Sequence, residues 1–165
     1  MHIYMRHGND NKICEYQHDH SLKSELIYKE EIIEKTRKLI KKYGFPKKIY
    51  CSPFKRVRET VDIMADYIYH KGKNIDIRVD PNLSRYFNSH EQANPSVRQT
   101  TIRYNPPLNE NGKMFKKRVD KVEQRISRND CTVWCVTHYL VIKRITKNNH
   151  IEIPKKMPFL YHVVI

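Results

Sequence analysis

The sequence predicts an α/β fold in which a mostly parallel central sheet lies between two layers of helices. Short apolar blocks typical of strands alternate with segments whose apolar residues recur at helical spacing, in the order β-α-β-α-β-loop-α-β-α-β. Strands that alternate with helices favour parallel pairing, and the connecting helices then cover both faces of the sheet. We therefore expect a three-layer α/β/α sandwich.

The first half of the chain is expected to hold three strands and two helices. Strands are predicted at residues 2–5, 49–51 and 75–79, and a helix is predicted from Ser21, its cap, to residue 43, with Gly44 ending it. The apolar face of that helix is predicted to comprise Leu22, Leu26, Ile33, Ile40 and Tyr43. Ser52-Pro53 is expected to open the second helix, with Ser52 as its cap. The buried stripe of this second helix is predicted to be Val57, Val61, Met64, Ala65 and Ile68.

The second half begins with an irregular segment and ends with two further strands. Residues 80–111 contain four prolines and no clear periodicity, and so long a loop is usually functional. A helix at 113–127, a strand at 131–136, a short helix to 148 and a strand at 159–165 follow. The apolar side of the helix at 113–127 is predicted to consist of Phe115, Val119, Val122 and Ile126.

Length and composition limit the organisation and the setting of the chain. Its 165 residues are expected to form a single domain over residues 1–165, with a lid-like insertion at about 80–111. No apolar run approaches the ~20 residues of a membrane span, and no signal peptide is evident, so we expect a cytoplasmic protein without membrane contact. The cysteines form no C-x-x-C pair, and Cys51, Cys131 and Cys135 lie in apolar strand-like segments, which favours buried, reduced thiols over disulfides or zinc ligands. The four cysteines are Cys14, Cys51, Cys131 and Cys135.

Charged and imidazole side chains follow three of the predicted strands. Arg6 and His7 end the first strand, Arg56 comes shortly after the second, and His138 follows the strand at 131–136. The carboxyl ends of parallel strands meet at one edge of a sheet, where ligands bind and helix N-termini attract anions. An imidazole can attack phosphorus, and arginine can bind the phosphoryl oxygens in a bidentate manner. This combination favours phosphoryl transfer.

These motifs, taken together and in this order, resemble the histidine phosphatase superfamily, which contains phosphoglycerate mutases and small phosphatases. The resemblance is carried by Ile3-Tyr-Met-Arg-His-Gly8, Ser52-Pro-Phe-Lys-Arg56-Val-Arg-Glu-Thr60 and Val136-Thr-His138. Pro106-Pro-Leu-Asn-Glu110-Asn-Gly, before a helix that contains Arg118, is similar to the Pro-rich helix start of that family. The resemblance spans most of the chain and implies a phosphoglycerate mutase-like fold.

The resemblance also implies roles for individual residues. His7 corresponds to the nucleophile that becomes phosphorylated, and Arg6 and Arg56 correspond to the residues that bind the phosphoryl oxygens. His138 corresponds to the second pocket histidine, which stabilises the transition state. Ser52 and Thr60 match positions that support the strand–helix turn. The family's phosphohistidine chemistry requires neither a metal nor a cofactor, so we expect none.

The usual acid of the family has no match in this chain. Where many members carry a Glu that protonates the leaving group, this chain either has Arg85 at that position or has lost one residue there. Three interpretations stay open: Glu91 or Asp80 is the acid, the leaving group needs little protonation, or the enzyme is weak or inactive. Of these two carboxylates Glu91 is the candidate acid, and Asn11 is a candidate phosphate ligand.

The predicted function is hydrolysis of a phosphomonoester or a phosphoramidate through a phosphohistidine on His7. The expected partner is a phosphorylated small molecule or a phosphoprotein. A phosphoglycerate mutase is less favoured, because the segment 80–111 is a short lid and transfer requires that water be excluded. The sequence does not determine the oligomeric state.

A different class of function is a catalytically weak or inactive phosphatase fold that acts as a basic, nucleic-acid-binding module. Its support is the net charge of +14, from 32 Lys and Arg against 18 Asp and Glu. Nucleic-acid binding is not favoured, because no RNA-recognition signature is present and coding bias alone can produce such a charge.

Overall fold

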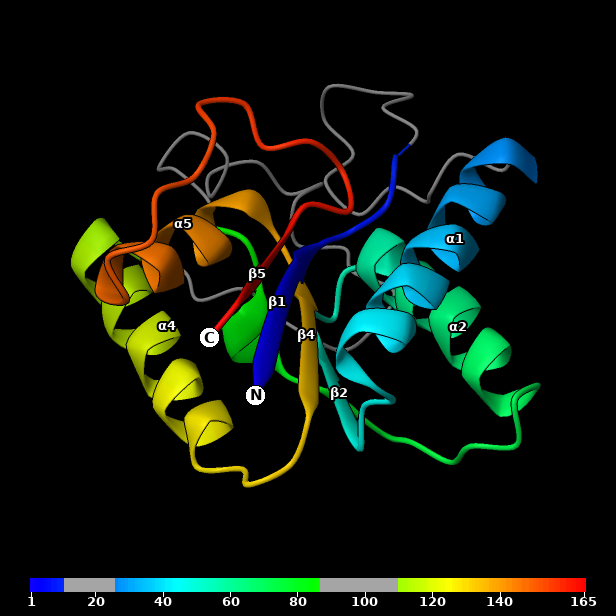
Figure 1. The fold of residues 1–165 in the computed structure, drawn as a ribbon. Helices are drawn as coiled ribbons and strands as arrows, with labels where there is room; N and C mark the ends of the chain where they lie inside the picture. The colour runs from blue at the N-terminus through cyan, green and yellow to red at the C-terminus, as the bar shows by residue number, and fades with distance from the viewer. Residues whose placement is uncertain (11–25, 87–109) are drawn as a thin grey trace.

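The computed structural model describes residues 1–10, 26–86 and 110–165, and within them the predicted α/β fold is confirmed (Figure 1). The elements are, in chain order, β1 (His2–Arg6), α1 (Leu26–Tyr43), β2 (Lys48–Cys51), α2 (Lys55–Tyr69), β3 (Asp76–Val79), the short 3₁₀ helix η1 (Pro81–Leu83), α4 (Gly112–Ser127), β4 (Val133–Thr137), α5 (Tyr139–Asn148) and β5 (His162–Val164). Within these described residues, no helix is both long and apolar enough to cross a bilayer.

The sheet has the strand order β3-β2-β4-β1-β5. Four strands are parallel, and β5 runs antiparallel to β1 at one edge. Arg6 pairs with Thr137 in the register of β1 and β4, and Cys51 pairs with Val136 in that of β2 and β4. The three central strands therefore end within a residue of one another. This alignment brings the segments that follow them to the same edge of the sheet.

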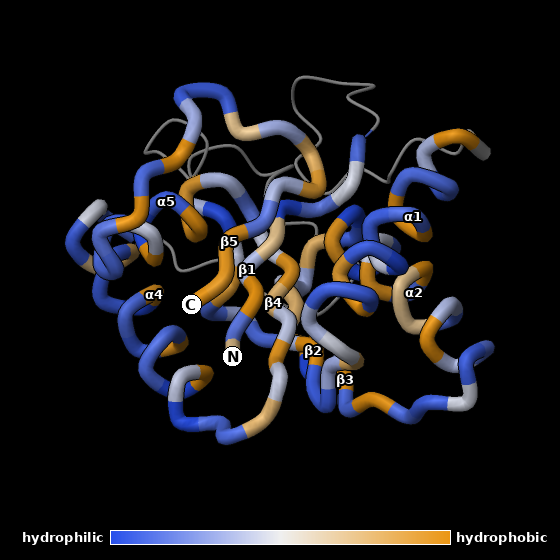
Figure 2. Tube along the Cα trace, in the orientation of Figure 1, coloured by the Kyte–Doolittle hydropathy of each residue, from blue (hydrophilic) through white to orange (hydrophobic). Residues whose placement is uncertain are grey.

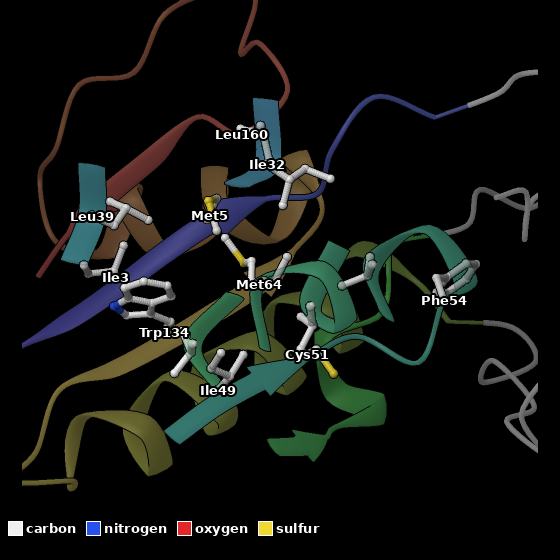
Figure 3. Packing of buried hydrophobic residues seen from close by; sticks show 14 residues of the cluster. Ile3, Met5, Ile32, Leu39, Ile49, Cys51, Phe54, Met64, Trp134 and Leu160 are labelled. Carbon is white, nitrogen blue, oxygen red and sulfur yellow. The ribbon is translucent and has the colours of Figure 1, made fainter. Parts of the chain in front are cut away.

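Helices cover both faces of the sheet, with α1 and α2 on one face and α4 and α5 on the other (Figure 1). Because successive strand residues point to opposite faces, Ile3 and Met5 pack toward α1 and α2, whereas Tyr4 packs toward α4 and α5. The hydropathy of the trace follows this division, since apolar positions gather along the strands and on the helix sides that face them (Figure 2). Trp134 of β4 is fully buried in the core cluster between the sheet and the helices α1 and α2, where Met64 of α2 also lies (Figure 3).

The structure confirms most of the predicted helix faces. The predicted stripe of α2 and that of α4 are buried at every position. Gly44 ends α1 in a left-handed conformation with a φ of 80°, where glycine has no Cβ to clash, and its N–H donates to the carbonyl of Ile40.

One expectation about helices was confirmed only in part, and another was wrong. Ile40 and Tyr43 of the predicted α1 face are partly buried and pack against the core, but the fully buried positions among the described side chains are Ile32, Thr36 and Leu39. The apolar residues of this helix span a wide arc, and its packing against α2 and the sheet decides which part of the arc is innermost. The expected cap, Ser52, does not begin α2, because the helix starts at Lys55. The expected start of α1 at Ser21 lies outside the described residues.

The thiols also differ in part from the expectation. Cys51 and Cys135 are buried free thiols, and burial raises the pKa of Cys51 to about 12. Cys131 is only half-buried, and Cys14 lies outside the described residues.

Candidate active site

A cavity of about 220 Å³ lies beyond the carboxyl ends of β1, β2 and β4. The structure brings together here the four residues that follow separate strands in the sequence: Arg6, His7, Arg56 and His138. The other described residues that line the cavity are Asp10, Arg85, Tyr86, Tyr139 and Leu140.

His7 is 4% exposed and its ring is held in one orientation. Its Nδ1 lies 2.8 Å from the carbonyl oxygen of Gly8, and because a carbonyl can only accept, Nδ1 carries the proton. The lone pair is therefore on Nε2, which accepts a hydrogen bond from Nε of Arg56 at 3.2 Å. Burial, and secondarily the Arg56 guanidinium, lowers the pKa of His7 to about 3, so the imidazole is neutral at pH 7.

His138 faces His7 across the cavity, with ring centroids 5.4 Å apart and planes inclined at 66°. Its Nδ1 lies 3.4 Å from Nη2 of Arg56, which can only donate, so Nδ1 accepts and Nε2 carries the proton. That Nε2–H donates to Oγ of Ser52 at 2.9 Å. Burial, and then the charge of Arg56, lowers the pKa of His138 well below its usual value.

Arg56 connects the two imidazoles. It belongs to the first turn of α2 and is 4% exposed, and its Nε lies 3.5 Å from the carboxylate of Asp10. Thr60, one turn further along α2, donates to the carbonyl of Arg56 at 2.7 Å and accepts from the N–H of Gly8 at 3.0 Å. Thr60 thus ties the chain after β1 to α2 and fixes the distance between Arg56 and His7.

Arg6 approaches the same cavity from the end of β1. One of its Nη atoms donates to the carbonyl of Met157, and its guanidinium carbon lies 4.2 Å from the ring centroid of Phe159. Its Nε is buried and has no hydrogen-bond partner among the described residues. Arg6 also lines the cavity, so its guanidinium adds positive charge beside His7.

An ion pair behind the cavity supports the segment that carries Arg85. Arg118 binds the carboxylate of Glu110 in a bidentate manner, at 2.6 and 2.7 Å. The same guanidinium donates to the carbonyls of Asn82 and Ser84 at 2.8 and 2.9 Å. The predicted match at Glu110 and Arg118 therefore has a clear structural task, which is to fix the chain after η1.

The sequence did not predict that Asp10 and Ser52 lie at the cavity. Asp10 lines the cavity beside Arg56, and the sequence feature that could have indicated this is a carboxylate three residues after His7. Ser52 binds His138, a contact between positions 86 residues apart that no local pattern indicates.

Of the other sequence-predicted residues, Glu91 and Asn11 lie outside the described residues. Asp80 is not among the described lining residues: its carboxylate accepts from the N–H of Asn82 at 2.9 Å and pairs with Arg125. In the described ranges, no cluster of three or more His, Cys, Asp or Glu side chains could hold a metal ion.

Comparison with solved structures supports the fold. A phosphoglycerate mutase from Bacillus anthracis is 15% identical, with a TM-score of 0.66 over 96% of this chain and 84% of the mutase. A mycobacterial glucosyl-3-phosphoglycerate phosphatase is 15% identical, with a TM-score of 0.60 over 97% of this chain and 86% of that one. The protein histidine phosphatase SixA in complex with tungstate is 16% identical, with a TM-score of 0.57 over 88% and 74% of the two chains.

Sequence comparison identifies the family. Comparison with curated proteins gives no significant match. The family model of the histidine phosphatase superfamily (branch 1), however, matches residues 3–162, which is nearly the whole chain. This match, together with the phosphoglycerate mutase-like fold, shows that the chain belongs to branch 1 of the histidine phosphatase superfamily.

Proposed function

We propose that this protein is a phosphatase that hydrolyses a phosphomonoester or a phosphoramidate through a phosphohistidine on His7. The observation that carries the proposal is the tautomer of His7. Its Nδ1–H is held by the carbonyl of Gly8, so the lone pair of Nε2 lies on the side of Arg56, in a cavity lined by three arginines. A neutral imidazole with a fixed lone pair is a competent nucleophile.

Two arginines are suited to bind the phosphoryl group. Arg56 already reaches both imidazoles, and Arg6 lines the same cavity beside His7. Fixed donors of this kind stabilise the charge that develops on the equatorial oxygens in the transition state. Nδ1 of His138 lies beside the same Arg56 guanidinium. Once this Nδ1 is protonated, it would donate a further hydrogen bond to the phosphoryl group.

The proposed reaction has two steps. In the first, the lone pair of His7 Nε2 forms a bond to phosphorus while the bond from phosphorus to the leaving group breaks, and the electron pair departs with the leaving group. In the second, water attacks phosphorus, the N–P bond breaks, and its electron pair returns to Nε2. The oxygen of water stays on the released phosphate, which also takes up its protons.

The substrate is a phosphorylated small molecule or a phosphoprotein side chain. Two of the similar solved structures, a glucosyl-3-phosphoglycerate phosphatase and a protein histidine phosphatase, represent these two classes. A substrate panel of sugar phosphates, nucleotides, aryl phosphates and phosphohistidine distinguishes them. Release of inorganic phosphate, without transfer to an added sugar-acid acceptor, distinguishes a phosphatase from a mutase.

The decisive test is hydrolysis of 4-nitrophenyl phosphate by the purified full-length chain and its His7→Asn variant. We expect the variant to lose at least about 10³-fold in kcat/KM, because the nucleophile is removed. His150→Asn is the matched control, since His150 is exposed and has a φ of 54°, which asparagine tolerates. Rapid quenching with labelled substrate should give an acid-labile, base-stable phosphoryl label on the wild type only. Full activity in His7→Asn would overturn the proposal.

A further inference from the structure

We propose that Phe159 is a positioning residue of the active site, which holds the guanidinium of Arg6 in place to bind the phosphoryl group. The inference rests on the proposed function, because it concerns how Arg6 is oriented in the same cavity. Phe159 lies shortly before β5, far along the sequence from the other residues of the site. It belongs to none of the motifs that carry the resemblance to the family.

The antiparallel edge strand brings Phe159 to the active site. Because β5 runs against β1, the residues before β5 lie beside the residues after β1 (Figure 1). The backbone pairing continues past the ends of both strands. The N–H of Arg6 donates to the carbonyl of Tyr161 at 2.9 Å, and the N–H of Leu160 donates to the carbonyl of His7 at 3.3 Å. Phe159, which comes directly before Leu160, therefore lies at the cavity end of the sheet.

Buried side chains on either side of Phe159 fix the turn that carries it. Met157 is 4% exposed and packs in the cluster beneath α4 and α5, whereas Leu160 packs in the cluster beneath α1 and α2 (Figure 3). Leu160 has a φ of 57°, in the left-handed region that is unfavourable for a bulky side chain. Such strain persists only where the surrounding structure imposes it, and it is concentrated at functional sites.

The aromatic ring of Phe159 contacts two residues of the site. The guanidinium carbon of Arg6 lies over the ring, 4.2 Å from its centroid, which is within the range of a cation–π contact. The ring centroid of His7 lies 5.7 Å from that of Phe159, and the two planes are inclined at 50°. Phe159 thus covers the Arg6 guanidinium and lies beside the proposed nucleophile.

The ring complements a hydrogen bond from the Arg6 side chain. An Nη atom of Arg6 donates to the carbonyl of Met157, which fixes one end of the guanidinium. This bond alone would leave the plane of the guanidinium free to rotate, and contact with the face of the Phe159 ring restricts that rotation. A guanidinium oriented in advance stabilises the charge on the phosphoryl oxygens without reorganising during the reaction.

The experiment measures tungstate binding and hydrolysis of 4-nitrophenyl phosphate in the wild type, Phe159→Leu, Phe159→Tyr and Phe45→Leu. Phe45 is the matched control, because it is also half-buried and the Nζ of Lys73 lies 5.8 Å from its ring centroid. We expect Phe159→Leu to lower kcat/KM and to raise the dissociation constant of tungstate, each by about 5- to 30-fold, because the ring contact is lost. Phe159→Tyr keeps the ring, so both quantities should stay within about 2-fold of the wild type, as in Phe45→Leu.

A double-mutant cycle with Arg6→Gln determines whether Phe159 acts through Arg6. Tungstate binding, measured by calorimetry, requires no turnover. In the Arg6→Gln background, Phe159→Leu should change the dissociation constant by less than about 2-fold, because the contact partner is already absent. A general perturbation of the cavity would instead give the same factor in both backgrounds.

Equal factors in the two backgrounds would overturn the inference, as would wild-type kcat/KM and tungstate binding in Phe159→Leu. A loss in Phe159→Tyr as large as that in Phe159→Leu, or a wild type that does not bind tungstate, would also overturn it. Failure of the proposed function has a different signature, which is a wild type that binds tungstate but shows no His7-dependent hydrolysis. The cycle on tungstate binding would still decide the role of Phe159 in that case.

Discussion

Arg56 donates its Nε–H to Nε2 of His7 at a distance of 3.2 Å. This Nε2 is the atom that acts as the nucleophile in the proposed mechanism. The same guanidinium lies 3.4 Å from His138 and 3.5 Å from Asp10. One side chain thus sets the orientation of both imidazoles before a phosphoryl group binds.

Replacing Arg56 by lysine should lower kcat for 4-nitrophenyl phosphate by about 10²- to 10³-fold. Lysine keeps the charge near Asp10 but lacks the planar fork that reaches His7 and His138 together. The measurement is steady-state kinetics, with Arg37→Lys as the control, because Arg37 is exposed on α1. A lysine variant with wild-type kcat would show that charge alone suffices.

Ser52 should act as a positioning residue for His138. Ser52→Ala removes the acceptor of a buried Nε2–H, which costs roughly 1–3 kcal/mol, so kcat should fall by about 10-fold or more. Ser52→Thr, which retains the hydroxyl, should recover most of the rate, and Ser127→Ala, at an exposed site, should have no effect. Without recovery by threonine, the hydroxyl would not be the cause.

Acid should destabilise the protein through His7. The pKa of His7 in the folded state, about 3, lies below the ordinary value of about 6.5, so the unfolded chain binds more protons between these pH values. The free energy of unfolding should therefore fall as pH drops from about 6.5 toward 3, by up to about 1.4 kcal/mol per pH unit from this group.

Denaturant unfolding of the wild type, His7→Asn and His150→Asn at several pH values measures the contribution of His7 to the pH dependence of the free energy of unfolding. The slope below pH 6.5 should be shallower in His7→Asn than in the wild type and unchanged in His150→Asn. An unchanged slope in His7→Asn would mean that His7 protonates freely in the folded protein.

Breaking the ion pair behind the cavity should destabilise the fold. Glu110→Gln leaves the largely buried guanidinium of Arg118 without its carboxylate, and the loss of one partner of a buried pair costs about 3–5 kcal/mol. Glu34→Gln removes a carboxylate from an exposed pair with Arg37 and should cost less than about 1 kcal/mol. Denaturant melts compare the two, and equal costs would contradict the structural role given to Glu110.

The sequence by itself determined the fold class, the order of the elements and the convergence of Arg6, His7, Arg56 and His138 at one sheet edge. These features are local, since the apolar period of 2.0 or 3.6 residues and the residues after each strand can be read within a short window. The buried stripe of α2 was predicted correctly for the same reason.

Only the tertiary structure decided which contacts those residues make. It selected the buried face of α1, placed Ser52 against His138 and Asp10 beside Arg56, and positioned Arg85 through Arg118. Each of these depends on segments far apart in the chain that meet when the sheet and its two helix layers pack. Several packing arrangements of the same helices and strands satisfy the local sequence pattern equally well. The burial of apolar side chains and the hydrogen bonding of buried polar atoms select among these arrangements.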